Sequence, residues 1–262
     1  MEKLNFKNTL SLANQLYKKS FKIAFLLAFM LSFISEYMSV YLLNHGLVEF
    51  VQSNGETLPA NFPSSDIILM MVITIILATL FVYGMIIILH GIYSKQSEIK
   101  LVDSFIISLQ IFAKRVLPFI GVFVLSMIAM SILTMLFRYI GIYIAILLFI
   151  TVLPAVLIGS EPVFKAITSN FKIIKRDFFF MLRVTFIILA LMTLKPILMY
   201  VFMNGLELMQ VNSNSIEMSV QNIVMTVIDA LILPYIFAVS VATYLSANSS
   251  NKIENTSDNH QN

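Results

Sequence analysis

The sequence predicts an all-α protein, a polytopic membrane bundle of six transmembrane helices with short cytoplasmic helices at the membrane surface. The chain has 262 residues, of which 59% are hydrophobic and 12% charged, whereas a soluble domain carries about 25% charged residues. The mean hydropathy of +0.90 likewise indicates a chain too apolar for a soluble domain. Several stretches of about 20 residues carry one charge or none, which is long enough to cross a hydrocarbon core about 30 Å thick. Lipid must therefore solvate the apolar excess.

Six spans can be placed between the clusters of charge. They cover Phe21–Leu43, Ile67–Leu89, Leu117–Leu136, Ile140–Ile158, Phe178–Met203 and Met218–Leu245. Long apolar runs satisfy their own backbone groups as helices, because no water reaches the hydrocarbon core. The expected organisation is a cytoplasmic amphipathic segment at 1–20, a six-span domain at 21–245 and a disordered cytoplasmic tail at 246–262.

The basic residues indicate the orientation of the bundle, because Lys and Arg accumulate in cytoplasmic loops. Of the 17 Lys and Arg residues, all but two fall in the N-terminal segment through Lys22, in 90–116, in 159–183 or in the tail. All four segments lie on the same side of the predicted bundle. The two exceptions are Arg138, in an opposite loop, and Lys195, within a span. We therefore expect both termini in the cytoplasm.

Three cytoplasmic segments share one pattern, a short amphipathic helix followed by a dibasic pair and the start of a span. The helices are expected at about 5–17, 103–113 and 161–174, and the pairs are Lys18-Lys19, Lys114-Arg115 and Lys175-Arg176. A threefold structural repeat would produce this pattern, and so would the ordinary placement of bases at cytoplasmic span ends. The six basic residues are candidate contacts with anionic lipid head groups, each gaining about 1 kcal/mol near an anionic leaflet.

The segment from Pro154 to Lys175 carries a resemblance. Pro154 lies late in the fourth span, Glu161 follows it, and Ala166 and Ser169 lie in a short helix that leads to the fifth span. In these features and in its six spans the chain resembles the YciC-type family of uncharacterised bacterial inner-membrane proteins. The resemblance implies an architecture and a bacterial inner (cytoplasmic) membrane location, and it transfers no catalytic or binding residue.

Enzyme motifs are missing from the sequence. Cysteine is absent, and His45, His90 and His260 are too scattered to share a metal site with carboxylates. No phosphate-binding glycine loop and no G-x-S-x-G motif is present. We expect no catalytic residue, no cofactor, no metal and no nucleic-acid partner, and we do not expect an enzyme.

Three ionisable residues lie deep within the predicted spans: Glu36, Lys195 and Asp229. Counted from the cytoplasmic span ends at 1.5 Å per residue, all three lie roughly 22–26 Å up, in the outer third of the bilayer. At a common height they could form an ion-pair cluster, which makes such residues tolerable. Alternatively, each side chain snorkels independently to the outer interface.

Two kinds of function fit these observations. The first is a non-enzymatic integral membrane protein that serves membrane organisation or homeostasis, with the lipid bilayer as its partner. The second is a small transporter or permease that works through the intramembrane charged layer. An accessory subunit of a membrane complex is a third interpretation.

Overall fold

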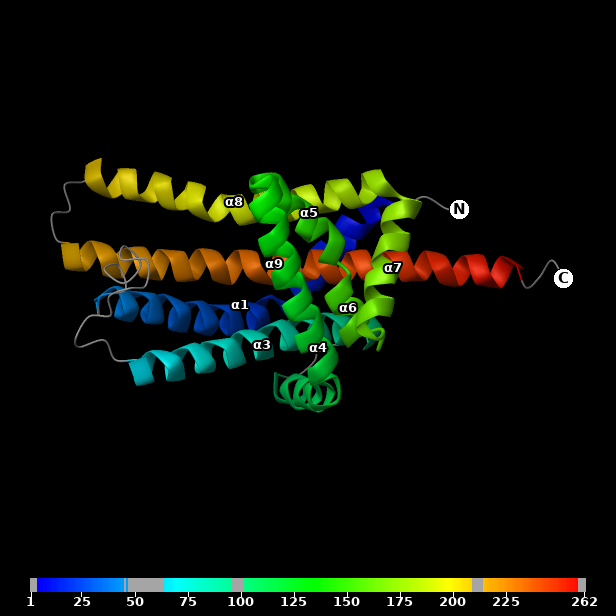
Figure 1. Cartoon of the computed structure of the whole chain (residues 1–262), viewed down its shortest axis with the longest axis horizontal. Helices are drawn as coiled ribbons and strands as arrows, with labels where there is room; N and C mark the ends of the chain where they lie inside the picture. The colour runs from blue at the N-terminus through cyan, green and yellow to red at the C-terminus, as the bar shows by residue number, and fades with distance from the viewer. Residues whose placement is uncertain (1–3, 45, 47–63, 96–100, 209–213, 259–262) are drawn as a thin grey trace. The chain divides into compact units, whose positions relative to one another are not determined.

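The computed structural model describes residues 4–44, 46, 64–95, 101–208 and 214–258 (Figure 1). Every regular element in these ranges is an α-helix. The helices are α1 (Phe6–Asn44), α3 (Ser64–Lys95), α4 (Leu101–Phe137), α5 (Tyr139–Phe149), α6 (Val152–Leu157), α7 (Val163–Arg176), α8 (Phe178–Leu208) and α9 (Asn214–Asp258). Within the described ranges, six spans are long and apolar enough to cross a membrane, which confirms the predicted all-α polytopic class.

The chain divides into two compact units. The first unit comprises residues 1–22, 83–193 and 234–262, and the second comprises 23–82 and 194–233. Helices α4 to α7 belong wholly to the first unit, whereas α1, α3, α8 and α9 each contribute a segment to both.

The core of the first unit forms around the short helix α6. Five of the six α6 residues are buried, and α6 packs against α4 and α7. The last turns of α3, the first turns of α8 and the second half of α9 contribute fully buried side chains, among them Met85, Met181 and Val239. A six-residue helix can be this apolar because α4, α5 and α7 pack against it.

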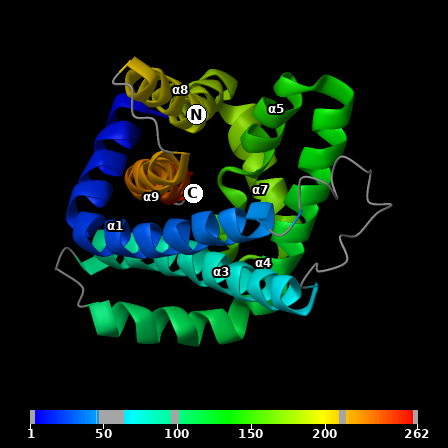
Figure 2. The same ribbon diagram turned by 90° about the vertical axis from the view of Figure 1, so that its left-hand side faces the viewer.

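The predicted surface helices are helical, but two of the three are not separate elements. Helix α1 begins at Phe6 and continues to Asn44, and α4 begins at Leu101 and continues to Phe137. No helix-stopping residue separates their amphipathic starts from the spans. Pro118 lies inside α4 without ending it. Figure 1 looks down the axis of the first turns of α4, while the rest of α4 runs across the view, and Figure 2 shows the same change of direction.

Only the third amphipathic segment forms a helix of its own, α7. Asp177, with φ −147° and ψ 82°, separates α7 from α8. The predicted start signal at Ser160-Glu161-Pro162 lies at the correct place but acts differently. Pro162 occupies the cap position, and Ser160 adopts a positive φ of 57° in the preceding turn instead of capping the helix.

The fourth predicted span is interrupted. It consists of α5 and α6, which are separated at Ile150 and Thr151. Pro154 lacks an N–H and cannot donate to the carbonyl of Ile150 four residues earlier. The hydroxyl of Ser240 on α9 donates to that carbonyl instead. A polar side chain from another helix therefore replaces the backbone bond that proline removes.

A single residue connects α4 to α5. Arg138 adopts φ 52°, and its N–H donates to the carbonyl of Thr134 at 2.8 Å. Gly141 follows where the two helices are closest, because a Cβ on Gly141 would lie 2.0 Å from the carbonyl oxygen of Leu133. Only glycine fits at this position.

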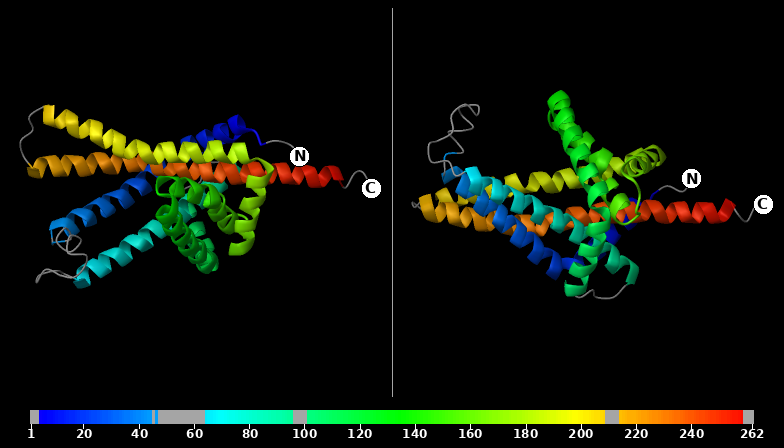
Figure 3. Two further views of the ribbon diagram at one scale, coloured as in Figure 1. Left: turned by 45° about the horizontal axis from the view of Figure 1, so that its top comes forward. Right: turned by 60° about the horizontal axis from the view of Figure 1, so that its bottom comes forward.

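The second unit consists of four helix segments. Figures 1 and 3 show the α8 and α9 segments side by side, and the Thr74 hydroxyl of α3 lies 3.4 Å from the Met38 sulfur of α1. Large apolar side chains on its surface are exposed, such as Met30 and Ile68. This exposure suits a segment whose surroundings are lipid.

The tail differs from the prediction of disorder from 246 to 262. Helix α9 continues to Asp258, and 259–262 lie outside the described residues. The start of the tail is held by the first unit, since the Thr9 hydroxyl donates to the Ser246 hydroxyl at 2.9 Å and Ala247 is fully buried. An established helix gains further turns without a new nucleation cost, so polar residues can continue it.

Candidate functional site

The structure brings Glu36, Lys195 and Asp229 together within the second unit. The Nζ of Lys195 donates a hydrogen bond of 2.7 Å to Oδ2 of Asp229 and lies 3.7 Å from Oε1 of Glu36. Lys195 belongs to α8, Asp229 to α9 and Glu36 to α1. We call these three residues the charged cluster. Of the two alternatives, ion pairing and independent snorkelling, Lys195 shows ion pairing, and it lies within ion-pair distance of both acids.

Small residues turn Glu36 toward its partner helices. Ala24, Ala28 and Ser32 on α1 are buried at intervals of four residues, and Glu36 continues the same stripe. Small side chains let neighbouring helices approach closely within a membrane. On α9, Asp229 adjoins a similar buried pair, Thr226 and Ala230.

The charged cluster is only partly enclosed by protein. The side-chain exposure is 30% for Lys195, 23% for Glu36 and 16% for Asp229. Two carboxylates face one ammonium, so the formal charge of the cluster is −1 when all three groups are ionised. Intramembrane ionisable groups with this kind of pairing often mark ion or proton pathways.

The six candidate lipid contacts fall into two classes. Lys18, Lys19, Lys114 and Lys175 are exposed, whereas the two arginines bind backbone carbonyls. Arg115 Nη1 donates to the carbonyl of Ser160 at 3.1 Å, and Arg176 Nη2 donates to that of Ala247 at 3.3 Å. In each Lys-Arg pair, arginine therefore joins its helix to another segment of the first unit while lysine stays accessible.

Sequence reasoning did not single out one buried polar side chain, that of Asn170 on α7. It is fully buried, and its Nδ2 donates to the carbonyls of Leu147 at 3.2 Å and Leu148 at 2.8 Å. Its Oδ1 accepts a hydrogen bond from the hydroxyl of Thr151. Asn170 thus satisfies the backbone groups at the break between α5 and α6. Pro154 in the fourth span could have indicated such a side chain, because a proline within a span leaves backbone carbonyls that require a donor from elsewhere.

The segment on which the resemblance rests is held by local contacts. The hydroxyl of Ser169 donates to Oε2 of Glu161 at 2.8 Å. Gly159 lies against α9, because a Cβ added there would be 2.1 Å from the Tyr244 hydroxyl oxygen. Both observations give these residues a packing role within the first unit.

Comparison with known proteins adds no relative: no family model, no curated protein and no solved structure matches the chain.

Proposed function

We propose that this integral membrane protein is a non-enzymatic component of the bacterial cytoplasmic membrane. It serves membrane organisation by holding anionic phospholipids through its exposed lysines, and the bacterial membrane location is what the resemblance to the YciC-type family implies. The supporting observation is the arrangement of the two Lys-Arg pairs. Arg115 and Arg176 are held through backbone carbonyls just before the predicted span starts at Leu117 and Phe178. They leave Lys114 and Lys175 exposed beside those span starts.

The energetic argument concerns the exposed lysines. Each basic residue near an anionic leaflet contributes about 1 kcal/mol, and the attraction extends over about one Debye length. Lys18, Lys19, Lys114 and Lys175 all belong to the first unit and all precede predicted spans. Together they produce a preference for anionic over zwitterionic lipid that salt weakens.

The test measures lipid selectivity at the surface of the reconstituted protein. Spin-labelled phosphatidylglycerol and phosphatidylcholine are compared by their relative association constants at low and high salt. Changing the four lysines to Gln lowers the preference for phosphatidylglycerol several-fold. Arg138→Gln, which removes an exposed base at the other end of α4, is the matched control and leaves the preference unchanged. An unchanged preference in the four-lysine variant contradicts the proposal.

The charged cluster supports a second function, proton-coupled transport. The carrying observation is that Lys195 is shared between Asp229 and Glu36. In proteoliposomes loaded with a pH-sensitive dye and given a membrane potential, the protein increases proton flux and Asp229→Asn abolishes the increase. A flux equal to that of protein-free vesicles rejects this function.

A further inference from the structure

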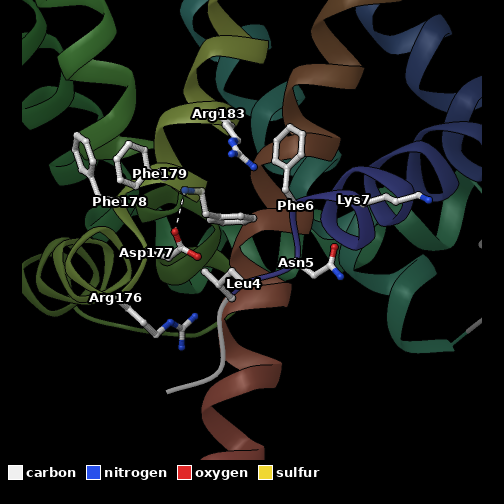
Figure 4. A pocket seen from close by; sticks show the side chains of 10 residues that line it. Leu4, Asn5, Phe6, Lys7, Arg176, Asp177, Phe178, Phe179 and Arg183 are labelled. Atoms are coloured by element: carbon white, nitrogen blue, oxygen red, sulfur yellow. Dashed lines mark hydrogen bonds between the residues drawn. The ribbon is translucent and has the colours of Figure 1, made fainter.

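A cavity of about 810 Å³ opens in the first unit between the start of α1 and the junction of α7 with α8. Figure 4 shows its lining, which joins basic, polar and aromatic side chains. Lys7, Arg176 and Arg183 supply three positive charges and Asp177 one negative charge. We propose that this cavity binds the phosphate group of an anionic phospholipid, a proposal that rests on the proposed function and assigns it a specific site.

Two of the cations that line the cavity, Lys7 and Arg183, are available to a ligand, whereas Arg176 already donates to the carbonyl of Ala247. Within the part of the chain that the structure describes, the Arg183 guanidinium and the Lys7 ammonium have no hydrogen-bond or ion-pair partner, and both side chains are exposed. In the view of Figure 4, Arg176 and Arg183 lie below and above the Asp177 carboxylate, and Lys7 points away from them. Arginine suits this task because its planar fork matches two phosphate oxygens.

The acid and the amide in the cavity already have structural tasks. Asp177 Oδ1 accepts the N–H of Phe180 at 3.0 Å and caps α8. Asn5 Oδ1 accepts the N–H of Asn8 at 3.1 Å and caps α1, which leaves the Asn5 side-chain NH₂ for a ligand. One backbone N–H at each helix start is therefore capped by a side chain, and the Asn5 amide group remains a side-chain donor for a ligand.

The aromatic residues indicate that the phosphate belongs to a lipid. Phe178 and Phe179 begin the apolar span Phe178–Phe202 and are 48% and 71% exposed. A phospholipid meets both parts of the lining, with its phosphate at the arginines and its acyl chains along the exposed rings. A water-soluble phosphate would leave those rings uncovered. Because the cavity carries an excess of two positive charges, the ligand is an anionic rather than a zwitterionic lipid.

The test is native mass spectrometry of the full chain in detergent, titrated with dioleoyl phosphatidylglycerol, dioleoyl phosphatidylcholine or sodium phosphate. We expect a bound phosphatidylglycerol whose dissociation constant rises about tenfold in Arg183→Gln. Asn5→Asp is the second variant, because Asp caps a helix as well as Asn does but adds a negative charge to the cavity. It weakens phosphatidylglycerol binding to a similar extent without unfolding α1.

Lys172→Gln is the matched control, since this base of α7 is exposed but lies outside the cavity lining and is not one of the four lysines of the proposed function. This control changes the dissociation constant less than twofold. Wild-type protein without any preference for phosphatidylglycerol refutes the proposed function as well. A wild-type preference that survives both Arg183→Gln and Asn5→Asp refutes the cavity alone. If sodium phosphate binds the protein with the same dissociation constant as phosphatidylglycerol, a lipid is refuted as the source of the phosphate.

Discussion

Lys195 lies closer to Asp229 than to Glu36, with Nζ–O distances of 2.7 and 3.7 Å. The ammonium is therefore hydrogen-bonded to one acid and only close to the other. This difference in distance predicts a stronger coupling of Lys195 with Asp229 than with Glu36. Both distances are those of paired charges, not of side chains that snorkel independently to the membrane interface.

Lys195→Met is expected to destabilise the protein, because it leaves two carboxylates without their cation. The cost lies between the values for exposed and buried ion pairs, at about 1–2 kcal/mol, since the three side chains are partly exposed. Thermal unfolding in detergent measures it. Equal stability of the wild type and Lys195→Met would show that the pairing contributes nothing.

Neutralising Asp229 should restore part of that loss. In a double-mutant cycle, Asp229→Asn costs less in the Lys195→Met background than in the wild type, because the carboxylate is no longer unpaired there. Glu36→Gln serves as the comparison and shows a smaller coupling with Lys195 at its longer distance. Additive effects of Lys195→Met and Asp229→Asn would contradict the hydrogen bond.

Gly141→Ala is expected to destabilise the turn between α4 and α5 by about 1–3 kcal/mol, as overpacked positions do. The new Cβ would lie 2.0 Å from the carbonyl oxygen of Leu133, which is backbone and cannot rotate away. Gly205→Ala is the control, because a Cβ there has no neighbour within 4 Å. It should leave the melting temperature unchanged or raise it, since Ala is the better helix former.

Asn170→Ala is expected to cost about 2–4 kcal/mol, because it leaves the Leu147 and Leu148 carbonyls and the Thr151 hydroxyl without their partner. Asn14→Ala removes one hydrogen bond to Tyr235 at an exposed site and should cost less than about 1 kcal/mol. Chemical unfolding in mixed micelles compares the two. A smaller loss for Asn170→Ala than for Asn14→Ala would reject the role at the helix break.

The predicted orientation is checked by reporter fusions in a bacterial host. Fusions after Leu43 and after Met203 should report the outer side of the membrane, and a fusion after Leu245 the cytoplasm. The reason is that Lys and Arg are concentrated in the loops on the side of Leu245, opposite to the span ends at Leu43 and Met203, and such loops are cytoplasmic. An outer-side signal from the fusion after Leu245 would reject the topology.

Sequence reasoning predicted the six spans but not where helices begin and end around them. Length and hydropathy identify a span, because crossing the bilayer requires about 20 apolar residues. They do not show whether a surface helix joins the span that follows. In α1 and α4 the two are continuous, whereas Asp177 separates α7 from α8. A tail rich in Asn and Ser was expected to be disordered, yet contacts at Ser246 and Ala247 hold its start as helix.

Composition and charge spacing by themselves determined the membrane class and the number of spans, and they predicted a common depth for Glu36, Lys195 and Asp229. These properties follow from how each residue partitions between water and lipid, which depends on the local sequence. Only the tertiary structure decided that the three side chains meet and that Asn170 completes the break at Thr151. Contacts between helices depend on the rotation of each helix about its axis, and packing against small residues such as Ala28 and Ala230 sets that rotation.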